Sequence, residues 1–145
     1  MSINQVKESF NFLFTDPSVT INTSPSGNTT SLTATMAGKT LFFTNCMVEE
    51  IFVFNFMYDK LYKVRYMAQN PPMSSKEKGL IDPLCSAVIL NLFNKDEDDL
   101  YKQYGKPIKS EEYKKIWVLP STTITISFKG KMATWSYFFS DYEKR

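Results

Sequence analysis

One missing residue type and one short glycine motif decide much of the chemistry that the sequence can support. The chain of 145 residues contains no histidine, which excludes Ser-His-Asp and Cys-His catalysis, histidine-ligated zinc and a histidine general base. Residues 36–40, Met-Ala-Gly-Lys-Thr, end like a phosphate-binding loop. The first glycine of that motif is Thr33 here, and a strand pattern follows where a helix is needed, so a hairpin turn at Ala37-Gly38-Lys39 is the better interpretation.

Acidic residues near position 96 have the spacing of a calcium loop. Asn94, Asp96 and Asp98 alternate as ligands would, but Asp99 stands where the loop needs glycine and Gly105 where it needs glutamate. We interpret these acids as a solvated helix start, favoured by the helix dipole. The sequence therefore predicts no metal, no cofactor and no catalytic residue. A hydrolytic carboxylate pair cannot be chosen from 15 acidic residues, because the two groups must converge in space.

The strongest pattern is an aromatic β-hairpin over residues 49–67. Two strand-like runs flank Asp59-Lys60, a pair that suits a tight turn. In the outgoing run, alternation predicts Tyr62, Val64 and Tyr66 on one face and basic side chains on the other. The incoming run, residues 51–57, is apolar on both faces. Such a strand is either covered on both sides or displays an apolar patch to a partner.

Length and composition indicate one domain over residues 1–145. Aromatic residues make up 15% of the chain, and the net charge of +2 is too small to indicate a polyanion binder. No signal peptide or membrane span is apparent, so we expect a cytoplasmic protein unless a leader has been removed. Cys46 and Cys85 are expected to be buried thiols, with a single bridge between them as the alternative.

The predicted helices and strands fall into two similar halves of the chain. Residues 2–14 predict a short amphipathic helix capped by Ser2, followed by strands near 19–22 and 32–36, although 18–31 also fits a loop. Asp82-Pro83 predicts the start of a second helix. Residues 94–99 either continue it as a polar turn or start another helix, and the helical stretch ends at Gly105. A charged loop then leads to strands at 116–119, 122–128 and 132–139.

The two helix ends carry the clearest sign of repetition. Leu13-Phe14-Thr15-Asp16-Pro17 matches Gln103-Tyr104-Gly105-Lys106-Pro107, and each precedes a strand and then a long hairpin, which gives pseudo-repeats at about 2–70 and 76–139. This order of elements resembles the tandem layout of the β-lactamase inhibitory proteins, and each half resembles the small outer-membrane assembly lipoproteins. The resemblance implies an α+β fold: a curved antiparallel sheet of about six to eight strands, with helices on one face and the other face open to a partner.

We therefore predict a non-catalytic module that binds another protein, as inhibitors, immunity proteins and assembly subunits do; a second copy of the chain is an alternative partner. Aromatic side chains dominate the energetics of such interfaces. The near-neutral charge argues against the alternative of single-stranded nucleic-acid binding, and an enzyme of unrecognised type is a further alternative. The candidate partner-binding residues are Phe52, Phe54, Tyr62, Tyr66, Trp117, Trp135 and Tyr137.

Overall fold

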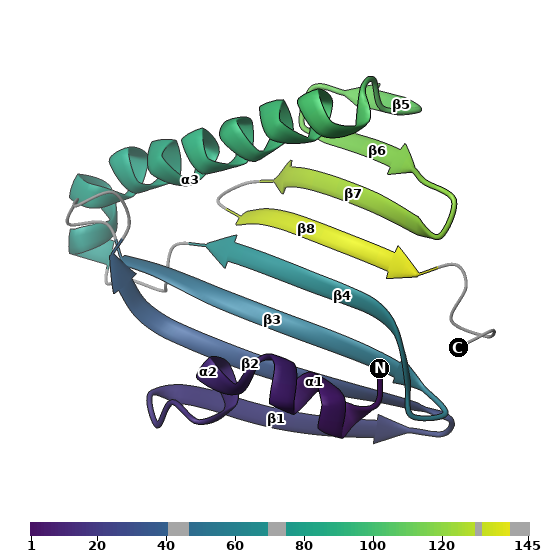
Figure 1. The fold of residues 1–145 in the computed structure, drawn as a ribbon. Coiled ribbons are helices and arrows are strands. Elements are labelled where there is room, and N and C mark those ends of the chain that lie inside the picture. Colours follow the sequence, from purple (N-terminus) through teal and green to yellow (C-terminus); the bar gives the residue numbers. More distant parts are fainter. Residues whose placement is uncertain (41–46, 70–74, 130–131, 140–145) are drawn as a thin grey trace.

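The structure is a computed structural model that describes residues 1–40, 47–69, 75–129 and 132–139. One eight-stranded sheet forms its centre, in the order β1-β2-β3-β4-β8-β7-β6-β5 (Figure 1). Every neighbouring pair is antiparallel. The predicted α+β class with an antiparallel sheet is thus confirmed. The predictions for Cys46 and Cys85 lie outside the part of the chain whose side chains are described.

The first half of the chain supplies two short helices and four strands. Ser2 caps the first helix in a capping box with Gln5, as a serine before an amphipathic run should. The helical stretch breaks at Phe10, so the predicted single helix is two. These elements are α1 (Ile3–Ser9), α2 (Asn11–Phe14), β1 (Val19–Ser26), β2 (Thr29–Thr40), β3 (Met47–Met57) and β4 (Lys60–Gln69).

The second half supplies one long helix and four strands. Its helix begins at Ser75 and continues through Pro83, so the predicted start at Asp82-Pro83 is wrong, whereas the predicted end is confirmed by Gly105 at φ 76°. The charged loop after it contains an unpredicted strand. The elements are α3 (Ser75–Tyr104), β5 (Lys109–Glu111), β6 (Lys114–Val118), β7 (Thr122–Lys129) and β8 (Met132–Phe139).

The aromatic hairpin forms as predicted, with its turn one residue earlier. Tyr58 and Asp59 both have positive φ, which matches the right-handed twist of the strands. Main-chain and carboxylate contacts hold the chain's start against this turn: Leu61 N donates to the carbonyl of Met1 at 2.9 Å, and Ile3 N donates to Asp59 Oδ1 at 3.2 Å.

Two register shifts correct the predicted strand patterns. Between β3 and β4, Phe56 pairs with Leu61 and Asn55 with Lys63, so Tyr62 is an extra residue and does not share the alternation of Val64 and Tyr66. Between β2 and β3 the register shifts from Met36 to Lys39. The predicted turn at residues 37–39 is therefore wrong, because β2 continues through it to Thr40.

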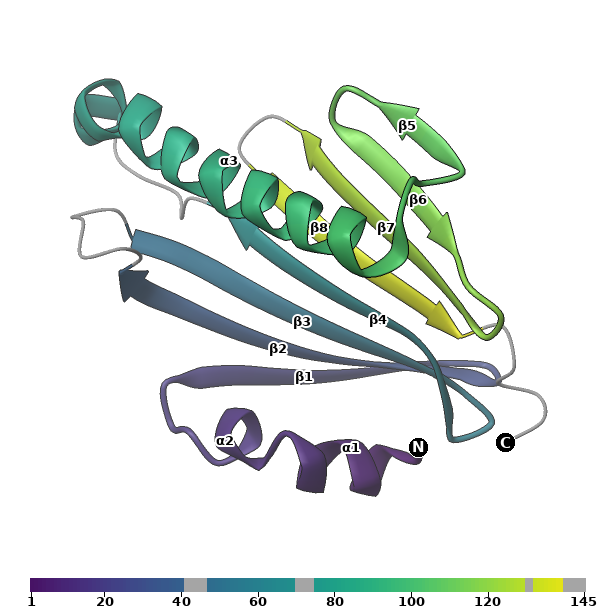
Figure 2. The same ribbon diagram turned by 45° about the horizontal axis from the view of Figure 1, so that its top comes forward.

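Helix side chains pack on the sheet in two clusters. Phe10, between α1 and α2, and Phe14 of α2 lie with ring centroids 5.0 and 6.1 Å from that of Phe54 on β3. Phe93 of α3 lies 6.5 Å from Trp135 on β8, and Figure 2 shows α3 running across this end of the sheet. Among the described helices, none combines the length and the apolarity that a membrane span requires.

Candidate functional site

The pairing register sorts the strand residues onto two faces. Phe52 of β3, Tyr66 of β4 and Trp135 of β8 lie side by side and share the face that the helix rings contact, which we call the helix face. Their neighbours in sequence, Val53, Arg65 and Ser136, form the matching row on the opposite face.

The sheet places six of the seven predicted partner-binding residues on the helix face. Phe54, Trp117 and Trp135 are buried in the core there, so they offer no surface to a partner. Phe52, Tyr66 and Tyr137 lie on the same face and are partly exposed. Tyr62 is the exception: its ring contacts Phe138 at 6.2 Å, and Phe138 pairs with Lys63 on the opposite face.

Hydroxyl side chains dominate the face opposite to the helix face, and we call it the hydroxyl face. Serines and threonines occupy its positions on both flanks of the sheet, and apolar side chains such as Ile51 and Met67 lie near the centre. Asn55 Nδ2 donates to Ser31 Oγ at 2.7 Å across two of its strands. The hydroxyl residues are Thr20, Ser24, Ser26, Thr29, Ser31, Thr33, Thr35, Thr123, Thr125, Ser127, Thr134 and Ser136.

The hydroxyl face is also basic. By register, its described charged residues are six cations and two carboxylates, an excess of four positive charges on a chain of net charge +2. Glu111 is paired with Lys109 at 3.4 Å, and Glu49 accepts a hydrogen bond from Gln69 at 2.8 Å. The cations are Lys60, Lys63, Arg65, Lys109, Lys114 and Lys129; the carboxylates are Glu49 and Glu111.

Arg65 lies at the centre of this face with an unsatisfied donor. Its Nε atom is buried and has no hydrogen-bond partner. Arg65 pairs with Val53 on one side and Ser136 on the other, and Val53 is buried although it faces away from the helices. A buried guanidinium N–H without an acceptor is costly unless a carboxylate or similar group is supplied from outside.

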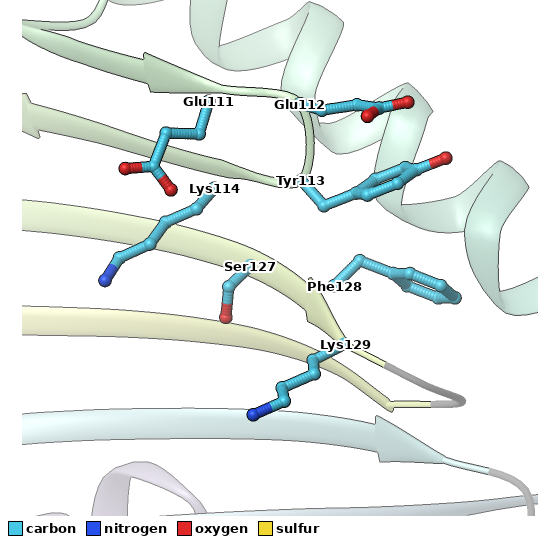
Figure 3. Close-up of a pocket in the computed structure, with 7 residues that line it drawn as sticks. All are labelled: Glu111, Glu112, Tyr113, Lys114, Ser127, Phe128 and Lys129. Carbon is cyan, nitrogen blue, oxygen red and sulfur yellow. The ribbon is translucent and has the colours of Figure 1, made fainter.

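A groove of about 490 Å³ opens where the hydroxyl face reaches the β5–β6 turn. Figure 3 shows Lys114, Ser127 and Lys129 on one side of the strands and the rings of Tyr113 and Phe128 on the other. The two rings lie 6.0 Å apart, and both line the groove. Two lysines and a hydroxyl thus face outward together at this corner.

A smaller pocket, of about 210 Å³, lies between α3 and β8 on the helix face. Asp96, Asp99 and Gln103 line it from the helix, and Trp135 and Tyr137 line it from the sheet. Burial raises the pKa of Asp96, and the charge of Asp99 raises it further, while Lys95 opposes both. Burial and the charge of Asp96 also raise the pKa of Tyr137.

A carboxylate of raised pKa in a pocket, such as Asp96, is also a feature of many enzyme active sites. Asp96 and Asp99 come from one helix and stand one turn apart, on the same side of anything bound there. A general acid and its partner carboxylate must instead flank the bond that breaks. The arrangement suits binding of a positive group better than hydrolysis.

The predicted protein-binding residues include neither Arg65 nor the rows of hydroxyl residues. The signal was the alternation of β7, whose Thr123, Thr125 and Ser127 share a face. Within the described ranges, no group of three or more Asp, Glu, Cys or His side chains is arranged so that it could hold a metal ion. No family model, no curated protein and no solved structure matches this chain.

Proposed function

We propose that the protein is a non-catalytic binding module whose hydroxyl face binds an acidic partner protein. The observation that carries this is the excess of four positive charges on that face, around an Arg65 Nε atom that lacks an acceptor. Carboxylates of a partner would pair with these cations, because a guanidinium and a carboxylate form strong, directional hydrogen bonds. Exposed Phe138 and partly buried Met67 and Ile51 would add apolar contact.

The arrangement of the helices supports this choice of face. The rings of Phe10, Phe14 and Phe93 all contact residues of the helix face, and a sheet needs only one buried face to be stable. The element order further supports an internal pseudo-repeat, since each half has helix and then four strands and the last strands, β4 and β8, pair at the centre. Such a layout is consistent with an inhibitor, immunity or assembly protein acting in the cytoplasm.

Charge reversal on the two faces tests the proposal. Lys63→Glu and Lys114→Glu change the hydroxyl face, and Lys102→Glu makes the same change in net charge on exposed helix surface. Each variant, checked for folding by circular dichroism, is used with the parent chain to capture proteins from nuclease-treated extract of its native cell. We expect proteins that the parent and Lys102→Glu retain and that both hydroxyl-face variants lose. Equal capture by all four chains would sink the proposal.

Phe54 is not a usable probe of this interface. It is buried against Phe10 and Phe14, so an aspartate there would place a charge in the core and unfold the chain. Loss of binding by such a variant would say nothing about the surface.

A second candidate, single-stranded nucleic acid, is favoured by one corner of the same face. Tyr62 and Phe138 lie edge to face at 6.2 Å beside Lys63, and Phe138 is 38% exposed. Bases stack on such rings while lysines hold phosphates. Titration with a labelled single-stranded oligonucleotide separates the two candidates: binding that weakens steeply with salt and is lost in Lys63→Glu supports nucleic acid, whereas no binding at low salt removes it. Sedimentation of the purified chain tests a second copy as the partner.

A further inference from the structure

The pocket between α3 and β8 combines negative charge with aromatic walls. Its helix side presents Asp96, Asp99 and the Gln103 amide, and its sheet side presents the rings of Trp135 and Tyr137. Tyr66 extends the aromatic wall, with its ring 5.1 Å from that of Trp135. No lysine or arginine is among the described residues that line the pocket.

Trp135 leaves a donor unused in this wall. The residue is 3% exposed, and its Nε1–H is buried without a hydrogen-bond partner. The indole donor of the other tryptophan has an acceptor. Trp117 Nε1 donates to the carbonyl of Gly105 at 2.9 Å and so links β6 to the end of α3. Buried indole N–H groups normally find an acceptor. The Trp135 N–H, by contrast, lacks an acceptor among the described residues.

The nearby basic groups do not neutralise the two aspartates. Lys115 is held by Glu97 at 3.0 Å, one residue along the helix from Asp96. Lys95 lowers the pKa of Asp96, but burial and Asp99 outweigh it and the net direction is upward. The hydroxyl of Tyr66 donates to Glu50 at 2.9 Å, which adds a further carboxylate behind the aromatic wall. A positive charge in the pocket would relieve this accumulation of negative charge.

We propose that this pocket binds a small organic cation that also carries a hydrogen-bond acceptor. Asp96 and Asp99 would neutralise the cation, the faces of Trp135 and Tyr137 would contact it as cation–π partners, and the Trp135 N–H would donate to the acceptor. The volume of about 210 Å³ equals roughly seven water molecules at about 30 Å³ each, which suits an amino alcohol rather than a nucleotide.

Calorimetric titration of the full chain tests the site with three matched probes. Choline carries both cation and hydroxyl, tetramethylammonium carries only the cation, and the alcohol in which carbon replaces the choline nitrogen carries only the hydroxyl. We expect choline to bind most tightly, tetramethylammonium more weakly, and the neutral alcohol not at all. Ethanolamine and a lysine-containing peptide serve as further arms, which distinguish a free amine from the side chain of a protein.

Three variants assign the contacts. Asp99→Asn should weaken choline binding roughly fivefold, as expected for a partly exposed charge, whereas Asp98→Asn removes the same charge from exposed helix surface outside the pocket and should leave binding unchanged. Trp135→Phe keeps a ring and removes the donor, so choline should lose roughly fivefold and tetramethylammonium should lose little. Absence of binding by every cation, equal binding of the neutral alcohol, or equal loss in Asp98→Asn would overturn the proposal, and a trapped water would then explain the Trp135 donor.

Discussion

The ion pair between Lys115 and Glu97 holds α3 against β6, and its removal gives the sharpest test of how the helix is positioned. Lys115 Nζ lies 3.0 Å from Glu97 Oε1, and the two side chains are only 10% and 19% exposed. Lys115 lies on the helix face, in register with Ile126 and Trp135. The pair thus fixes the helix segment that carries Asp96 over the strands that complete its pocket.

The two partners should respond unequally to loss of the pair. Breaking a fully buried pair costs about 3–5 kcal/mol and breaking an exposed one about 0–1 kcal/mol. Glu97→Gln leaves the more buried ammonium without its carboxylate, so we expect a loss of about 2–3 kcal/mol in the free energy of unfolding. Lys115→Met keeps the apolar stem and leaves a carboxylate that water can reach, so about 1–2 kcal/mol is expected.

A double-mutant cycle measured by urea unfolding checks this reasoning. The double variant, Glu97→Gln with Lys115→Met, has no unpaired charge and should lie within about 1 kcal/mol of the parent, which gives a coupling energy of about 2 kcal/mol or more. For a domain of 145 residues, Glu97→Gln should also lower the melting temperature by roughly 6–12 °C. A coupling energy below about 0.5 kcal/mol would refute the reasoning, because the two side chains would then contribute independently.

Three further predictions follow from the packing and the titrating groups. Phe93→Ala should lower the free energy of unfolding by about 3–5 kcal/mol, because Phe93 is buried against Phe128 and Trp135, whereas Phe12→Ala, at a side chain 64% exposed, should change it by less than about 0.5 kcal/mol in the same urea assay. Burial raises the pKa of Tyr66 and Tyr137, with Glu50 and Asp96 adding to it respectively. The unfolded chain therefore releases these protons first, and stability should fall as the pH rises above about 10, with a shallower fall in Tyr66→Phe. Because burial raises the pKa of Asp96, its charge opposes folding at neutral pH, so Asp96→Asn should raise the melting temperature at pH 7 and lose that advantage as the pH falls through the raised pKa of Asp96.

The sequence predicted those features that local patterning controls. Period-2 alternation located β7 and β8, and the aromatic runs located the hairpin of β3 and β4. Ser2 and Gly105 marked helix ends because capping depends on the residues beside the cap. β5 was missed because Lys109–Glu111 is a short, exposed edge strand with no apolar face to produce a pattern.

The face of the sheet that binds a partner could not be predicted, because β3 is apolar on both sides. Phe54 and Val53 are equally suitable for a core, and the choice depends on where α1, α2 and α3 lie, which is set by contacts distant in sequence. The extra residue at Tyr62 had the same origin, since a bulge depends on the register of the partner strand. Aromatic side chains were therefore assigned to an interface when three of the seven complete the core.

Two features that stability does not explain lie in the same pocket. Two other buried polar groups are matched: Trp117 has the carbonyl of Gly105, and Lys115 has Glu97. The Trp135 N–H, by contrast, has no acceptor. The charged carboxylate of Asp96 opposes folding, because burial raises its pKa, and an asparagine at this position would carry no such charge. Local choices that conflict with the stability of a fold concentrate at functional sites. A variant such as Asp96→Asn that becomes more stable while losing choline binding would join the two observations, because the charge that weakens the fold would then be the charge that holds the ligand.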